Sequence, residues 1–313
     1  MKGMTPDFRE SLRKALDLAA IAGKTTQPEV DKVIQDLINY NNPLRAAIPR
    51  VPGSGEAYLL NRRTATGTAD FVNDSEEPGD TDSTYDRKTF SFKTILERGK
   101  VTQFAQDAGR SYKDLLAEEM DNASRVVRNK EEDAIINGSV SANPKSFDGL
   151  RILTPSGQVI EAGGSGGDGD VLSLTLMDEA FDLCLGSPDV VICSKRTRRK
   201  LYSLLQATQQ FVGTTEVKGG FRVMAYNDAG VFYSQFISDA QTQGDSDIAS
   251  DLFVLDTDFV SMAVLSEAKM VPLAKTSSQF DAFDVRVSEV LVMKNPVYGI
   301  ARLAGIIPAV IVP

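Results

Sequence analysis

The segment GGSGGDGDV at residues 163–171 contains the residue types from which phosphate-binding and calcium-binding loops are built. Gly164 to Gly169 match the spacing GxGxxG, in which glycines let the backbone approach a pyrophosphate at the start of a helix. Here six residues from Asp170 onward precede the next helical pattern, and Asp168 and Asp170 would repel a phosphate. The segment also matches part of a calcium β-roll repeat, but such repeats occur in tandem and one copy is present. We predict a flexible surface loop.

A second candidate is the block Lys195-Arg196-Thr197-Arg198-Arg199-Lys200, which has five basic residues in six positions. Such a block can bind nucleic acid or an acidic partner, or it can be the solvated start of a helix that Ser194 caps. Cations are unfavourable at a helix N-terminus because the helix dipole is positive there. This favours a negatively charged partner surface over direct reading of nucleic acid.

Carboxylates are concentrated between Thr64 and Tyr85, a stretch without any lysine or arginine. At this density carboxylates could bind calcium, but the twelve-residue EF-hand spacing is missing. We therefore expect either simple solvation or contact with a basic neighbouring surface. The acidic residues of this stretch, with one that follows it, are Asp70, Asp74, Glu76, Glu77, Asp80, Asp82 and Asp86.

Two further carboxylate pairs could suggest acid–base chemistry. Asp256 and Asp258 would share one face of a strand, as paired acids of glycosidases do, and Asp178 is followed by Glu179. No set of partner residues surrounds either pair in the sequence. We assign neither of them a catalytic role.

Composition limits the chemistry further. The chain of 313 residues contains no histidine and no tryptophan, which excludes imidazole-based triads, HExxH zinc sites and histidine proton relays. A net charge of −9 disfavours tight binding of nucleic acid. Cys184 and Cys193 are too few for a disulfide framework, so we expect a reducing cytoplasm. We predict no enzyme activity, no cofactor, no bound metal and no membrane span.

The elements that would position these residues suggest two lobes and a long arm. The segments EAYLLNRR and RKTFSFKTIL alternate as strands do, and with the acidic stretch between them they predict a hairpin reaching roughly 55 Å. A helix that Ser111 caps should run to about Ile136 over roughly 39 Å. Asn137-Gly138 ends it, with a left-handed backbone at the glycine, and SVSANPKS forms a corner between lobes.

A mixed pattern of short helices and strands follows Gly149. LRILTPSGQVIEA predicts a hairpin, LTLMDEAFDLCL a helix, DVVICS a buried strand and RTRRKLYSLLQAT another helix. Strands joined by turns are expected at FRVMAYNDAGVFYSQF and at DLFVLDTDFVSMAVLS, with further strands in the C-terminal part of the chain.

A long helix that ends in AIINGSVSANPKSFDGLRIL after an acidic hairpin arm resembles the major capsid proteins of tailed phages with the Hong Kong 97-like fold. The tail FDVRVSEVLVMKNPVYGIARLAGI is similar to their closing strands. The order of segments covers nearly the whole chain. The resemblance implies an α+β fold with an N-terminal arm (1–27), a peripheral domain with a spine helix (28–52, 94–150 and 270–313), an extended loop (53–93) and an axial domain (151–269).

The resemblance also implies a function. The chain would assemble in the host cytoplasm into pentamers and hexamers of an icosahedral head shell, which encloses the double-stranded DNA of a tailed bacteriophage in the virion. Portal and scaffolding or decoration proteins would be partners, and DNA would be enclosed without sequence-specific binding. Candidate inter-subunit contacts are Arg62, Arg63, Asp74, Glu76, Glu77, Asp80, Lys195, Arg196, Arg198, Arg199 and Lys200.

Some members of this family join a lysine of the extended loop to a neighbour's asparagine. No lysine lies between Gly53 and Asp86, so we do not expect this covalent bond here, although Lys88 and Lys93 lie nearer the base of the loop. Two alternatives remain. One is the shell of an encapsulin-type nanocompartment, which has a similar fold; the other is an α/β enzyme with Gly163–Gly169 as a phosphate cradle.

Overall fold

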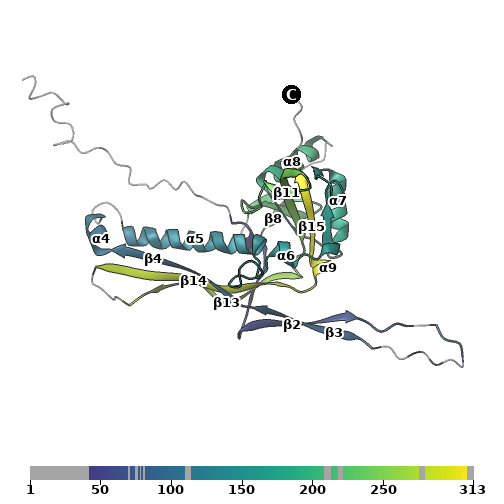
Figure 1. Ribbon diagram of the computed structural model, residues 1–313, viewed down its shortest axis with the longest axis horizontal. Helices are drawn as coiled ribbons and strands as arrows, with labels where there is room; N and C mark the ends of the chain where they lie inside the picture. The colour runs from purple at the N-terminus through teal and green to yellow at the C-terminus, as the bar shows by residue number, and fades with distance from the viewer. Residues whose placement is uncertain are drawn as a thin grey trace, which may run out of the picture.

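A computed structural model describes residues 42–69, 71–74, 77, 79, 82–109, 114–207, 213–217, 221–274 and 279–308. Their strands form three sheets, of four, nine and two strands. Figure 1 shows a long helix lying along the four-stranded sheet, a separate lobe built around the nine-stranded sheet, and a two-stranded arm that projects away from both. The predicted N-terminal arm lies outside the described residues.

The four-stranded sheet and the long helix α5 (Leu115–Asn137) form the elongated body. The strand order is β1 (Arg50–Pro52), β13 (Val260–Pro272), β14 (Phe280–Met293) and β4 (Lys93–Thr102). Ala123 and Val127 of α5 pack against Phe283 and Val285 of β14. These contacts hold the helix along the sheet. The short helices α3 (Leu44–Ala47) and α4 (Gln103–Gly109) flank this body.

The long helix begins later than predicted. Asp114 is its N-cap, and the Asp114 Oδ1 atom accepts the backbone N–H groups of Leu116 and Ala117 at 3.1 Å each. The predicted cap, Ser111, lies outside the described residues and precedes the observed cap. The 23 residues of α5 span about 34 Å.

The second lobe contains the nine-stranded sheet, with the order β5-β15-β12-β7-β10-β9-β8 and with β6 and β11 at the side. The helices α7 (Leu174–Leu183) and α8 (Lys195–Ala207) pack into one core on the same face of this sheet. The strands are β5 (Val159–Glu161), β6 (Asp170–Val171), β7 (Val190–Cys193), β8 (Gly213–Val217), β9 (Phe221–Tyr226), β10 (Ala229–Tyr233), β11 (Gln241–Gln243), β12 (Ser246–Leu255) and β15 (Ile300–Ile307).

The hairpin predicted for residues 150–162 is wrong. This segment forms the short helix α6 (Leu150–Leu153), a 3₁₀ turn (Ser156–Gln158) and β5, which pairs in parallel with the distant strand β15. Pro155 lacks the N–H group that a paired strand would donate, and β15 offers a partner that local patterns do not reveal.

Buried Cys184 and Cys193 are free thiols, as expected.

Two strands cross the predicted domain boundaries. β13 begins at Val260, within the range 151–269 assigned to the axial domain, yet it pairs with β14 in the body. β15 lies in the range 270–313 assigned to the peripheral domain, yet it pairs with β12 in the second lobe. Asn295 and Pro296 start the one-turn helix α9 (Pro296–Gly299), which separates β14 from β15 and redirects the chain between the sheets. The other domain boundaries stay predictions.

The corner after the long helix is present, but its glycine works differently from the expectation. Gly138 has φ −53°, so its backbone is not left-handed. A Cβ atom at Gly138 would lie 2.4 Å from the carbonyl oxygens of Ala134 and Phe147. Glycine is therefore needed here for close backbone packing. Gly149 donates its N–H to the Gly138 carbonyl at 2.8 Å and closes the loop between them.

No helix among the described residues is long and apolar enough to cross a bilayer.

Candidate functional site

The two-stranded arm exposes large apolar side chains that the rest of the described chain does not cover. β2 (Ala57–Ala65) and β3 (Thr84–Ser91) pair in antiparallel fashion from Ala57↔Ser91 to Ala65↔Thr84. Beyond this ladder the chain continues to a tip at which the Phe71 side chain is fully exposed. Tyr85 is 71% exposed and Leu59 58% exposed on the strands themselves. Figure 1 shows the strands β2 and β3 of the arm extending away from the rest of the molecule.

Among the described residues of the arm, those at its root pack against the body. Tyr58, Phe90 and Phe92 are partly buried against the core that joins the two sheets. Arg62 donates a guanidinium N–H to the carbonyl oxygen of Met293, at the end of β14. Burial lowers the pKa of Arg62, and the negative charge of Asp86 opposes this. The arm is therefore anchored near its base, while Phe71 and Tyr85 farther out are exposed.

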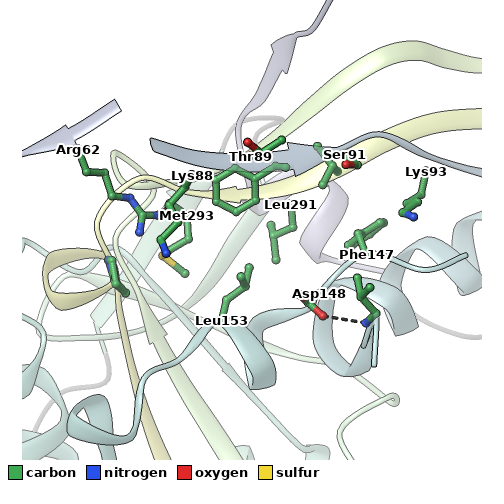
Figure 2. A pocket seen from close by; sticks show the side chains of 14 residues that line it. Arg62, Lys88, Thr89, Ser91, Lys93, Phe147, Asp148, Leu153, Leu291 and Met293 are labelled. Carbon is green, nitrogen blue, oxygen red and sulfur yellow. Dashed lines mark hydrogen bonds between the residues drawn. The ribbon is translucent and has the colours of Figure 1, made fainter. Parts of the chain in front are cut away.

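A cavity of about 430 Å³ lies between the arm root and the body. Figure 2 shows Arg62 and Lys88 reaching into it from the arm, above Leu291, Met293 and Leu153 of the body. Its one acidic side chain, Asp148, accepts the backbone N–H of Val140 at 2.8 Å. The lining residues are Arg62, Lys88, Thr89, Phe90, Ser91, Lys93, Val140, Phe147, Asp148, Leu153, Val290, Leu291, Met293 and Pro296. The cavity thus combines an apolar floor with three cations, which suits an apolar side chain within an acidic segment.

Salt bridges fix the segment that leads into the arm. Arg50 of β1 binds Glu131 of α5 at 2.6 Å, Glu289 of β14 at 2.8 Å and Glu267 of β13 at 3.2 Å. Arg45 also pairs with Glu131 and, at 3.2 Å, with Glu267. Because Glu131 and Glu289 are almost completely buried, losing the arginine would leave uncompensated charge in the interior. The network therefore connects the base of the arm to the long helix and to the sheet.

Two buried carboxyl groups here have raised pKa values. Burial raises the pKa of Glu132 to about 8, although hydrogen bonds from Ser234 and from the N–H of Leu44 oppose the shift. Burial, together with the charge of Glu131, raises the pKa of Glu289 to about 7, while Arg50 opposes it. Near neutral pH both groups therefore take up protons more readily than exposed glutamates do.

These shifts predict how stability depends on pH. Between the ordinary glutamate pKa of 4.5 and about pH 8, Glu132 and Glu289 hold more protons in the folded chain than in the unfolded chain, so their contribution to stability falls as pH rises. Glu132→Gln imitates the protonated form, and we expect it to raise the free energy of unfolding at pH 8 by roughly 1–3 kcal/mol and to change little at pH 5. Urea unfolding of the dissociated subunit measures this. Glu179→Gln, at an exposed carboxylate, is the control. If the free energy of unfolding depends on pH equally in the wild type, Glu132→Gln and Glu179→Gln, the account is contradicted.

The predicted contact residues differ in their exposure and in their contacts. Arg63, Asp74, Glu77, Lys195 and Arg199 are exposed, and Lys200 is half-buried, whereas Glu76 and Asp80 lie outside the described residues. Arg62 is used at the arm root. The remaining two fasten α8 to its own lobe: Arg196 donates to the Ile248 carbonyl at 2.7 Å, and the Arg198 guanidinium lies 5.2 Å from the ring centre of Tyr233. Ser194 caps α8 as expected, accepting the N–H of Thr197.

The glycine-rich loop does not have the geometry of a phosphate cradle. The short strand β6 follows it, and α7 starts only at Leu174, with Ser173 as its cap. The backbone N–H of Gly166 already donates to the Glu161 carboxylate at 3.0 Å, and Asp168 accepts the N–H of Asp245 at 2.8 Å. The loop has ordered turns, with positive φ at Gly163, Gly164, Gly166 and Gly169.

Of the two carboxylate pairs named above, Asp256 and Asp258 have a structural role. Asp256 accepts the N–H groups of Ser187 and Asp258 at a turn. Within the described ranges no cluster of three or more potential ligands could bind a metal ion.

Sequence reasoning missed the buried glutamates. In the stretch EEDAIIN the glutamates resemble the solvated part of a helix, but Glu131 and Glu132 are 1% exposed. The two arginines of PLRAAIPR could have indicated them. Isolated arginines in a proline-rich segment that packs beside an acidic helix are suitable partners for buried carboxylates. The sequence does not say which glutamates these arginines meet.

The comparisons with known proteins agree with this geometry. The Phage capsid family model matches residues 22–183, slightly more than half of the chain. No curated protein sequence matches significantly. Among solved structures, the cyanophage A-1(L) capsid superposes with TM-score 0.73 at 12% identity, covering 93% of this chain and 99% of that one.

Two further structures show how widely the fold is shared. The SrpI encapsulin of Synechococcus elongatus PCC 7942 has TM-score 0.68 at 12% identity, covering 93% and 95% of the two chains. Mycobacterium phage Bobi has TM-score 0.65 at 14% identity, covering 92% and 97%. The predicted α+β fold of the Hong Kong 97-like type is confirmed, and the chain belongs to the phage capsid family.

Proposed function

We propose that this protein is the major capsid protein of a tailed bacteriophage, whose copies assemble into the pentamers and hexamers of an icosahedral shell around double-stranded DNA. Membership of the phage capsid family supports a structural role. Within the structure, one observation carries the proposal: the arm exposes apolar side chains that its own chain does not cover.

An isolated two-stranded hairpin is at best marginally stable in water. This arm has Phe71 at its tip and Leu59 and Tyr85 along its strands, all without an apolar neighbour that would bury them. Exposed apolar groups on a projecting segment mark a contact with another molecule. In a closed shell of identical copies, each arm lies on its neighbour and each body receives one arm.

Charge and reach indicate how neighbouring copies meet. The tip carries acidic residues and no cation, whereas the cavity at the arm root carries Arg62, Lys88 and Lys93 around an apolar floor. Phe71 is nine residues beyond Arg62, which corresponds to about 30 Å of extended chain, so the tip of an extended arm lies well away from the cavity of its own subunit. We propose that the tip of one copy occupies this cavity in the next.

The proposal includes no enzyme activity. Arg63, Asp74 and Glu77 of the arm would contact the neighbouring copy. An acidic chain suits a container that encloses DNA without binding it tightly. Maturation would repack contacts between subunits while the subunits themselves stay folded. Portal and scaffolding or decoration proteins are further proposed partners, and the assembled virion is the proposed location.

An encapsulin-type compartment is the alternative that the fold supports. The TM-score of 0.68 to SrpI encapsulin equals that to the capsid of a native GTA particle, so shape does not separate the two classes. The match to the phage capsid family favours the viral function.

Expression of the full chain, followed by sedimentation and negative-stain microscopy, tests the shell. Closed icosahedral particles are expected, and a protein that remains monomeric at high concentration would overturn the proposal. The contents of native particles then distinguish the two classes. Particles that contain this chain and nuclease-protected double-stranded DNA support the capsid, while particles that contain a cargo enzyme and no genome support the compartment.

A further inference from the structure

Two helices of the second lobe expose charges of opposite sign. α7 presents Glu179 and Asp182, which are neighbours on one side of the helix at a spacing of three residues. α8 presents Lys195 and Arg199, which share one side at a spacing of four. Each charged pair has an exposed apolar neighbour: Leu185 follows α7 and is 60% exposed, and Tyr202 continues the basic side of α8 and is 46% exposed.

Each helix carries its charge at the unfavourable end. Asp182 lies in the last turn of α7, where the free backbone carbonyls are already negative, and no basic residue lies in that turn. Lys195 is the first residue of α8, where the free N–H groups are already positive, and no acidic residue lies in that turn. Both arrangements cost stability in an isolated subunit, and both become favourable if the two ends meet.

The described part of the chain does not compensate these charges. Among its residues, Glu179, Asp182, Lys195 and Arg199 form no ion pair, in contrast to Arg196, which binds the carbonyl of Ile248 and faces Asp239 at 3.5 Å. Figure 1 places α7 along one flank of the lobe and α8 at the end of the lobe far from the body. The two charged surfaces are therefore separate sites on one molecule.

We propose that the basic side of α8 in one copy binds the acidic side of α7 in the next copy. Leu185 and Tyr202 would lie within this contact and the charged pairs would border it, as in other protein interfaces. Two different surfaces that bind each other make a head-to-tail contact, which closes into a ring when the rotation between copies allows it. The inference rests on the proposed function, because such rings are the pentamers and hexamers of the shell.

Charge reversal tests the contact in the full-length chain. The variant Lys195→Glu/Arg199→Glu makes both surfaces acidic, and Glu179→Lys/Asp182→Lys makes both basic. Each is expected to reduce the yield of closed particles at least tenfold, measured by sedimentation. The fourfold variant with both reversals restores opposite charges and is expected to recover assembly. In an equimolar mixture of the two double variants, each copy can bind only copies of the other variant. The mixture should therefore form six-membered rings, in which the variants alternate, but not five-membered rings.

Two controls separate assembly from folding. Lys145→Glu reverses an exposed cation in the loop after α5, and particle yield should be unchanged. The melting temperature of the dissociated subunit should stay the same or rise in Lys195→Glu/Arg199→Glu, because acidic residues suit a helix N-terminus. If wild-type particles form and both double variants assemble equally well, this inference is wrong while the proposed function stands. If wild-type protein forms no particles, the proposed function itself fails.

Discussion

Removing the tip of the arm is expected to abolish shell assembly without unfolding the subunit. Ala65 and Thr84 are paired across the ladder, so residues 66–83 can be replaced by Asn-Gly, which closes two antiparallel strands in a tight turn. The removed segment contains Phe71, which is fully exposed, and the acidic residues from Asp70 to Asp82. We expect the melting temperature of the dissociated subunit to change by less than about 2 °C. Closed particles, counted by negative-stain microscopy, should be absent.

A single substitution separates the apolar contact from the length of the arm. Phe71→Ser removes the exposed ring and is expected to reduce the yield of particles strongly, while Phe71→Leu keeps an apolar side chain and should retain most of it. Because Phe71 is fully exposed in the subunit, neither change should affect the unfolding of the free chain. Normal shells from Phe71→Ser and from the shortened arm would show that the tip has no role in assembly.

The corner after the long helix is expected to be the position most sensitive to a small substitution. A Cβ atom on Gly149 would lie 2.7 Å from the carbonyl oxygens of Ala134 and Ile135, and one on Gly138 would lie 2.4 Å from that of Ala134. These are rigid backbone atoms at the end of α5. Gly138→Ala and Gly149→Ala should therefore each lower the free energy of unfolding by about 2–4 kcal/mol.

Gly157→Ala is the matched control for the corner. A Cβ atom there would meet nothing within 4 Å, so the free energy of unfolding should change by less than about 0.5 kcal/mol. Urea unfolding of the dissociated subunit measures all three variants. If the corner glycines tolerate alanine as well as Gly157 does, the corner is not the tightly packed joint between lobes described above.

Elements with a strong local pattern could be predicted from the sequence. The strand DVVICS and the helix after it have β-branched residues, a serine cap and helical spacing, and they form β7 and α8. The segment FRVMAYNDAGVFY has a turn at Asn227-Asp228, both with positive φ, between β9 and β10. The arm could be predicted because EAYLLNRR and the first half of RKTFSFKTIL alternate as strands do. The second half of RKTFSFKTIL was assigned wrongly, since it belongs to β4 in the body.

Features that depend on distant partners could not be predicted. β5 exists because β15, about 140 residues later, supplies the edge with which it pairs, so a local hairpin was the wrong expectation. Glu131, Glu132 and Glu289 are buried because Arg45 and Arg50 or backbone groups meet them across the fold. The sequence also does not show which residues of the basic block contact their own lobe. Arg196 and Arg198 do so, whereas Lys195 and Arg199 are exposed.

Hydrogen–deuterium exchange of the arm in free subunits and in closed particles tests the central claim most directly. If the strands β2 and β3 gain their stability from a neighbouring copy, the amides of residues 57–65 and 84–91 should exchange rapidly in the free subunit and slowly in the shell. Residues 123–137 of the long helix should be protected in both states. Equal protection of the arm before and after assembly would contradict the account.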